Sequence, residues 1–211
     1  MTGGYSIPAG YELVDEHIGS GKTSRVSLLR RIADGERFAW KVPGDESAAT
    51  REMLAILVER SEVWRRIGVA RGVARIAPDG TTVLQPYVEG RTLRSVLKDT
   101  DLIRDPDDPL LPPLVETFRR MARARVSVSG LNTENFIFDG SRFMVIDSGA
   151  IREWRSPWRA WAIQRRKIKK HWIRWDGHSA EDVRGLVARI EAGLRLPRPT
   201  LAERIFIALK G

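Results

Sequence analysis

A glycine-rich segment and a lysine that follows it have the residue types needed to bind a polyphosphate. The segment is Gly19-Ser20-Gly21-Lys22-Thr23-Ser24-Arg25-Val26, and the lysine is Lys41 in Ala39-Trp40-Lys41. Glycines let the backbone approach phosphate oxygens closely, and a fixed cation neutralises their charge. Short glycine patterns also occur in plain hairpin turns, so a hairpin without a ligand is the alternative.

The Gly21-Lys22-Thr23 part of this segment does not belong to a P-loop. A P-loop has a glycine five positions before the glycine that precedes the lysine, and that position is Glu16. A P-loop lysine also begins a helix, whereas Val26, Leu28 and the residues after them favour a strand. We therefore interpret the segment as a turn between two strands.

The elements around this turn are expected to form a small antiparallel sheet with one helix. Apolar residues at helical spacing predict the helix, and Gly68 is its expected end. Turns are expected at 33–35 and at Pro78-Asp79-Gly80. The predicted elements are three strands within 11–42, a helix over 45–66, and strands near 73–77 and 82–88.

The rest of the chain is expected to be mainly helical. A β-hairpin is predicted around Asp139-Gly140, a strong turn signal. The predicted elements are a short helix from Leu93, a loop over 101–113, helices over 114–125, 155–175, 180–192 and 201–209, and hairpin strands at 136–138 and 143–146. We therefore predict an α+β fold with a sheet domain at 1–88 and a truncated, mainly helical domain at 89–211.

Further motifs follow the glycine-rich segment in a fixed order. They are Lys41, Glu52 in Arg51-Glu52-Met53-Leu54, Asn135 in Leu131-Asn132-Thr133-Glu134-Asn135, and Asp147 in Asp147-Ser148-Gly149. In this order they resemble the protein-kinase-like superfamily, over roughly residues 11–150. The resemblance implies a two-lobed fold that binds ATP with Mg²⁺ and transfers a phosphoryl group to a hydroxyl.

The resemblance also assigns the residues that hold the nucleotide. Lys41 would contact the α- and β-phosphates, and Glu52 would pair with Lys41 and fix its position, with Glu59 and Glu62 as alternatives. Tyr87-Val88-Glu89-Gly90 is similar to the hinge between the lobes. The implied nucleotide-binding set is Gly19, Ser20, Gly21, Lys22, Thr23, Ser24, Val26, Ala39, Lys41, Gln85 and Tyr87.

Asn135 and Asp147 would be the metal ligands by the same resemblance. Their amide and carboxylate oxygens suit Mg²⁺, which prefers oxygen ligands and bridges the phosphates. Lys41, Glu52, Asn135 and Asp147 would together form the catalytic set.

One residue departs from the superfamily pattern. The catalytic loop should carry an aspartate five residues before Asn135, but Gly130 stands there. A general base typically contributes about 10²–10⁴-fold, and glycine cannot act as one. Phosphoryl transfer depends mostly on positioning and charge neutralisation, so one hypothesis is an active kinase that uses another group, such as Ser129, Asn132 or a carboxylate from elsewhere. The alternative is a pseudokinase that binds nucleotide without transferring phosphate.

Two short runs are similar to bacterial lipopolysaccharide core (heptose/Kdo) kinases. They are Asn135-Phe136-Ile137 and Ile146-Asp147-Ser148-Gly149. Small bacterial effector kinases that act on protein serine or threonine are an equally compact alternative. The expected acceptor is therefore a hydroxyl of a protein side chain or of a phosphorylated glycolipid, and we expect a monomer.

Residues 154–175 combine tryptophan with basic residues. Five of the seven tryptophans lie there. A helical stripe would contain Trp154, Trp158, Trp161, Ile168, Trp172 and Trp175. One interpretation is a helix that meets an anionic membrane surface, which would make the chain a polyanion-binding protein. The other is a stripe that packs on the second domain, with solvated charges.

Composition excludes several classes of site. The net charge of +9 suits a polyanionic partner, but without a recognised nucleic-acid module we expect no nucleic acid. There are no cysteines for disulfides or thiolate metal sites, and the histidines are only His17, His171 and His178.

No apolar run approaches the roughly 20 residues of a membrane span. Without a secretory signal we expect a cytoplasmic protein, at most peripheral at the inner membrane, with signal-less export as an alternative.

Overall fold

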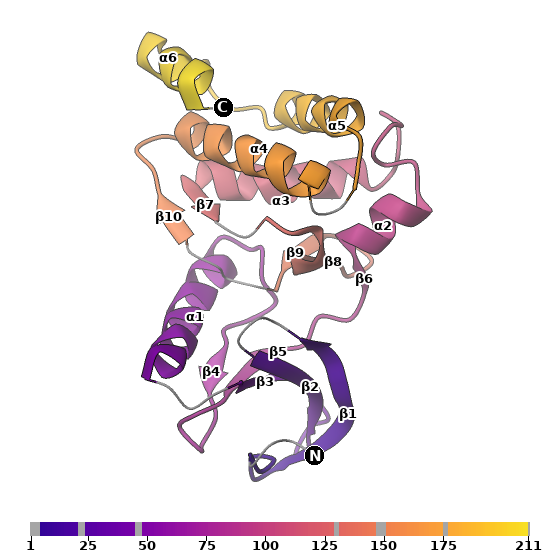
Figure 1. The fold of residues 1–211 in the computed structure, drawn as a ribbon, viewed down its shortest axis with the longest axis vertical. Helices are drawn as coiled ribbons and strands as arrows, with labels where there is room; N and C mark the ends of the chain where they lie inside the picture. Colours follow the sequence, from indigo (N-terminus) through magenta and orange to yellow (C-terminus); the bar gives the residue numbers. More distant parts are fainter. Residues whose placement is uncertain are drawn as a thin grey trace. The chain divides into compact units, whose positions relative to one another are not determined.

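The computed structural model describes residues 5–20, 24–44, 48–128, 131–146, 151–174 and 177–210. The chain divides into two compact units, which are described separately below. Unit 1 comprises Met1–Arg66 and Ala70–Tyr87, and unit 2 comprises Ile67–Val69 and Val88–Gly211. The change at Tyr87 lies one residue before the predicted domain boundary. Within the described ranges the chain has the predicted α+β class (Figure 1).

Unit 1 contains an antiparallel sheet with the strand order β1-β2-β3-β5-β4. The strands are β1 (Tyr11–Ser20), β2 (Ser24–Arg31), β3 (Arg37–Pro43), β4 (Arg75–Ile76) and β5 (Val83–Pro86). These strands confirm the predicted sheet, although β4 and β5 are shorter than expected. Asp79 accepts hydrogen bonds from the backbone N–H groups of Thr81 and Thr82 at 2.7 and 2.9 Å, so these residues belong to the turn.

The two faces of this sheet have different partners. One face carries a buried apolar cluster. Its members are Leu29, Phe38, Trp40, Val42, Ala77 and Leu84. The helix α1 (Ala48–Arg66) packs on the other face, where Leu54 lies against Val83. The helix ends where the sequence predicts, because Gly68 has a φ of +75°, a conformation that terminates helices.

Unit 2 is mainly helical in its described part. Its helices are α2 (Leu93–Asp99), α3 (Leu111–Arg123), α4 (Pro157–Arg174), α5 (Ala180–Gly193) and α6 (Leu201–Lys210). Helices α3, α4 and α5 pack against one another (Figure 1). Phe118 of α3 and Trp161 of α4 lie at the centre of this contact, with their ring centroids 5.9 Å apart. Both side chains are buried, so the core of unit 2 forms between these helices.

The start of α3 corrects one prediction. The helix begins at Leu111 and not at Leu114, so the expected loop over 101–113 ends at Leu110. Pro112 and Pro113 occupy the first turn, where a helix needs no N–H donor and proline has the correct φ. Proline therefore starts this helix instead of preventing it. The same effect explains why α4 begins at Pro157 and not at Arg155.

Short strands complete unit 2. The predicted hairpin is confirmed as β8 (Phe136–Phe138) and β9 (Phe143–Val145), and β6 (Arg91–Thr92) pairs with β8. A separate pair joins β7 (Val126–Val128) to β10 (Ile151–Glu153). The sequence did not predict β6, β7 and β10, because two or three residues are too few to show an alternating pattern.

Candidate functional site

Four of the predicted nucleotide-binding residues lie on one face of the sheet in unit 1. Lys41 of β3 is paired with Val26 of β2, and Ala39 is paired with Gln85 of β5. Paired residues share a face of a sheet, and so do residues two apart on a strand. We call Val26, Ala39, Lys41 and Gln85 the β-strip. All four are half-buried, so the strip is accessible to a ligand in part.

Helix α1 packs on the sheet face that carries the β-strip. Val83 is the partner of Lys41 on β5, and it contacts Leu54 of α1. Glu52 lies two residues before Leu54 and is exposed. The proposed partner of Lys41 is therefore on the element that covers this face, and the Lys41–Glu52 pair itself stays a prediction.

The described ends of the glycine-rich segment close a hairpin. Gly19 is paired with Val26, and Ser20 with Arg25. Gly21, Lys22 and Thr23 lie outside the described residues, and the described Ser24 is half-buried at the start of β2. A Cβ atom added at Gly19 would meet nothing within 4 Å. Packing against the described residues therefore does not require glycine at this position.

Tyr87 is held by backbone contacts within unit 1. Its N–H donates to the carbonyl of Arg37 at 3.0 Å, and its carbonyl accepts from the Arg71 guanidinium at 2.9 Å. These bonds fix the backbone at the start of the predicted hinge segment. Gly90, at the end of that segment, has a φ of +151°, and a Cβ atom there would lie 2.0 Å from the carbonyl oxygen of Phe138. Only glycine fits this position.

In unit 2, Asn135 lies beside the residue that precedes Asp147. Asn135 ends the short 3-10 helix η1 (Thr133–Asn135), and its backbone carbonyl accepts a hydrogen bond from the N–H of Ile146 at 3.0 Å. Asp147 is the next residue after Ile146 and lies outside the described residues. Asn135 is thus hydrogen-bonded to Ile146, the residue directly before Asp147, which is the other predicted metal ligand.

Asn132 holds the turn that presents Asn135. Its side chain accepts a hydrogen bond from the N–H of Glu134 at 3.1 Å, and its carbonyl accepts from the N–H of Asn135 at 3.0 Å. The Glu134 carboxylate is engaged with Arg94 of α2 at 2.6 Å. Asn132 therefore has a structural role as a cap, which accounts for an asparagine here without a part in proton transfer.

Helix α4 holds the segment that leads to this turn. Gln164 Nε2 donates to the carbonyl of Val126, Lys167 Nζ to Val128 at 2.8 Å, and Trp172 Nε1 to Leu131 at 2.9 Å. The side chains of Gln164 and Trp172 are fully buried. Burial, together with repulsion from Arg152, lowers the pKa of Lys167 below its ordinary value. We call these three donors the α4 clamp.

The α4 clamp holds the backbone on both sides of Ser129 and Gly130, which lie outside the described residues. Sequence reasoning missed it. Gln164 and Lys167 interrupt an otherwise apolar stripe of the predicted helix. Because buried polar groups are hydrogen-bonded, these two side chains indicated that hydrogen-bond acceptors lie nearby. The sequence did not identify the acceptors.

The tryptophan stripe packs mainly inside unit 2. Trp161, Ile168 and Trp172 are buried, and Trp161 Nε1 donates to the Glu191 carboxylate at 2.8 Å. Trp154 lies before α4, with Nε1 bonded to Ser127 at 2.8 Å, and Trp175 falls outside the described residues. These contacts support the interpretation of a packed stripe for the rings concerned. Within the described residues, no helix has the length and apolarity needed to cross a bilayer.

The described residues contain no cluster of three or more histidine, cysteine, aspartate or glutamate side chains that could hold a metal. Asn135 is not one of these residue types, and Asp147 lies outside the described residues. Comparison of the chain with protein-family models finds no match, and comparison with curated proteins also finds none.

Proposed function

We propose that this chain is a protein-kinase-like phosphotransferase, which transfers the γ-phosphate of ATP to a hydroxyl group. The observation that carries the proposal is the hydrogen bond from Ile146 N–H to the Asn135 carbonyl. In this proposal the Asn135 amide and the Asp147 carboxylate bind the same Mg²⁺ ion through oxygen atoms. The α+β architecture, with an antiparallel sheet in unit 1 and a helical unit 2, is compatible with a kinase-like fold.

The β-strip supports the nucleotide-binding half of the proposal. Lys41 would neutralise the α- and β-phosphates, and the apolar Val26 and Ala39 beside it offer surface to the adenine base. The turn between β1, which ends at Ser20, and β2, which begins at Ser24, would cover the phosphates. In this proposal Glu52 fixes the direction of the Lys41 side chain, which lowers the cost of ordering it around the nucleotide.

Asn135 and Asp147 would supply the metal ligands. Mg²⁺ bound there neutralises charge that develops on the phosphate oxygens. In the reaction the acceptor oxygen forms a bond to the γ-phosphorus while the bond to the bridging oxygen breaks, and ADP leaves. The hydroxyl proton must go to solvent or to a group other than residue 130, because Gly130 has no side chain to receive it.

Gly130 favours a second candidate function. A nucleotide-binding pseudokinase would retain Lys41, Asn135 and Asp147 but act through its conformation and not through transfer. The acceptor also stays a proposal: a serine or threonine of a protein, or a sugar hydroxyl of a phosphorylated glycolipid. Both questions are answered by one labelling experiment.

Purified protein is incubated with γ-labelled ATP and Mg²⁺, together with bacterial envelope extract or whole lysate. Lys41→Ala and Asp147→Ala should each abolish the transfer of label. Lys98→Ala, which removes an equal charge from an exposed position on α2, should not. The partition of label between lipid and protein fractions identifies the class of acceptor.

Stabilisation by ATP without any transfer would support the pseudokinase. If millimolar ATP does not bind at all, both candidates are wrong.

A further inference from the structure

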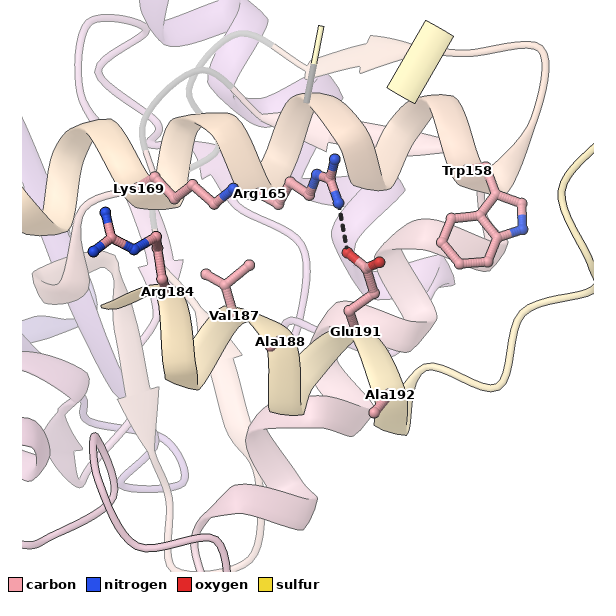
Figure 2. A pocket seen from close by; sticks show the side chains of 8 residues that line it. All are labelled: Trp158, Arg165, Lys169, Arg184, Val187, Ala188, Glu191 and Ala192. Carbon is pink, nitrogen blue, oxygen red and sulfur yellow. Dashed lines mark hydrogen bonds and ion pairs between the residues drawn. The ribbon is translucent and has the colours of Figure 1, made fainter. Parts of the chain in front are cut away.

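A groove in unit 2 has the character of an anion-binding site. It lies between α4 and α5, has a volume of about 550 Å³, and is lined by Trp158, Arg165, Lys169, Arg184, Val187 and Glu191 among others. Figure 2 shows the Lys169 side chain pointing towards Arg165 between the two helices, whereas the Arg184 guanidinium extends away from Glu191 and Trp158 at the open end of the groove. The groove is on a different part of α4 from Gln164 and Lys167, which contact the segment before Asn135.

Positive charge exceeds negative charge in this groove. Arg165, Lys169 and Arg184 face a single carboxylate, that of Glu191. That carboxylate already accepts from Arg165 at 2.9 Å and from Trp161 Nε1 at 2.8 Å. Among the ion pairs of the described residues, none involves Lys169 or Arg184. Lys169 and Arg184 therefore lie beside the groove with no carboxylate of the described residues at contact distance.

The surroundings of Lys169 disfavour its charged form. Its side chain is half-buried. Burial lowers the pKa of Lys169, and repulsion from Arg165 and Arg184 lowers it further, against the opposing effect of Glu191. An anion between these cations would offset the repulsion and replace lost hydration with charge-assisted hydrogen bonds.

The remaining walls are apolar. Val187, Ala188 and Ala192 of α5 form one side, and the indole of Trp158 lies at the far end from Lys169 and Arg184 (Figure 2). The Trp158 ring is fixed, because its Nε1 donates to the carbonyl of Pro197. Trp158 precedes Lys169 by three turns of α4, about 16 Å along the helix axis, so a small ligand with its anionic head at Lys169 contacts Val187 and Ala188 and does not reach Trp158.

We propose that the groove between α4 and α5 binds a phosphomonoester, with its phosphate at Lys169 and Arg184 and its apolar or aromatic part against Val187 and Ala188. A phosphate dianion matches these two cations in charge, and the Arg184 guanidinium can contact two phosphate oxygens at once. The ligand could be a soluble phosphomonoester or the phosphomonoester headgroup of a lipid. The site does not depend on the proposed phosphotransfer, because it uses none of the β-strip residues, Asn135 or Asp147.

The test uses phenyl phosphate and inorganic phosphate as soluble probes, and phosphatidylcholine vesicles with or without phosphatidic acid. Lys169→Ala with Arg184→Ala should weaken binding of phenyl phosphate by at least about tenfold, since two charge-assisted contacts are lost. The matched control is Arg166→Ala with Lys170→Ala, which removes the same charge from exposed positions on α4. The control should change binding by less than about twofold.

The probes separate the sources of the phosphate. Phenyl phosphate binding tighter than inorganic phosphate indicates a soluble ligand with an apolar body. Binding only to vesicles with phosphatidic acid, lost in the groove variant and kept in the control, indicates a lipid headgroup. Equal losses in both double variants, or no binding of any probe, would overturn the proposal. Arg184→Glu, at an exposed position, repeats the test if the double variant does not fold.

Discussion

The functional residues proposed in unit 1 and those proposed in unit 2 are held in place in different ways. The β-strip sits on adjacent strands whose register is set by backbone hydrogen bonds between neighbours. In unit 2, the segment before Asn135 is held by side chains of α4, whose donors and acceptors are 38 to 41 residues apart in the sequence. One region is positioned by its backbone and the other by three side chains.

This difference predicts different responses to mutation. A strand in the middle of a sheet keeps its register when one side chain changes, because the ladder distributes the positioning over many bonds. The α4 clamp has few bonds, and each loss leaves a backbone carbonyl without its donor. Single substitutions should therefore affect stability more at the clamp than at the β-strip.

The largest effect is expected for Trp172. Trp172→Ala should lower the free energy of unfolding by about 3–5 kcal/mol, because a fully buried aromatic ring is removed. Trp172→Phe keeps most of the ring but not the donor to the Leu131 carbonyl, and should cost about 1–3 kcal/mol. Urea unfolding measures both. A Phe variant as stable as the original chain would show that Trp172 acts only by packing.

A smaller effect is expected for Lys167. Lys167→Met keeps the apolar stem but removes the donor to Val128, and should cost about 1 kcal/mol at neutral pH. Arg166→Met, on the exposed side of α4, should change stability by no more than about 0.5 kcal/mol. If both variants behave alike, the clamp does not depend on Lys167.

The Lys167 comparison also has a pH dependence. Because the pKa of Lys167 is lowered in the folded chain, the unfolded chain binds more protons between that pKa and 10.5. Stability from this group therefore rises with pH through that window. Relative to Lys167→Met, the original chain should gain stability as the pH increases towards 10.5. A constant difference would show that burial of the ammonium group carries no cost.

The smallest effect on stability is expected in the β-strip. Lys41→Met should change the free energy of unfolding by less than about 1 kcal/mol, since the Met side chain retains the apolar stem. ATP binding should nevertheless be weakened, because the cation for the phosphates is gone. Thermal unfolding with and without ATP measures both properties. Loss of stability as large as that of Trp172→Ala would erase the distinction between the two regions.

The sequence predicted regular elements better than their connections. The strands of unit 1 and the hairpin around Asp139-Gly140 were predictable, because alternation and turn residues are local signals. The start of α3 was not, since Pro112 and Pro113 are ambiguous between a loop and a first helical turn. The strands β6, β7 and β10 were too short to give a pattern.

The candidate site was predictable in its residue types but not in its supports. Residue order identified Lys41, Asn135 and Asp147 as candidates, whereas the α4 clamp pairs residues that are distant in the sequence. The tryptophan stripe was ambiguous because a membrane surface and a protein core require the same apolar face. Burial of Trp161 and Trp172 distinguishes the two for these rings.

The proposed function requires Lys41 to bind the phosphates of ATP and Asn135 to bind the accompanying Mg²⁺ ion. Isothermal titration of ATP, with Mg²⁺ and then with a chelator, tests it most directly. Lys41→Met should weaken ATP binding under both conditions, whereas Asn135→Ala should remove only the gain in affinity that Mg²⁺ provides. An Asn135→Ala variant with an unchanged response to Mg²⁺ would contradict this requirement.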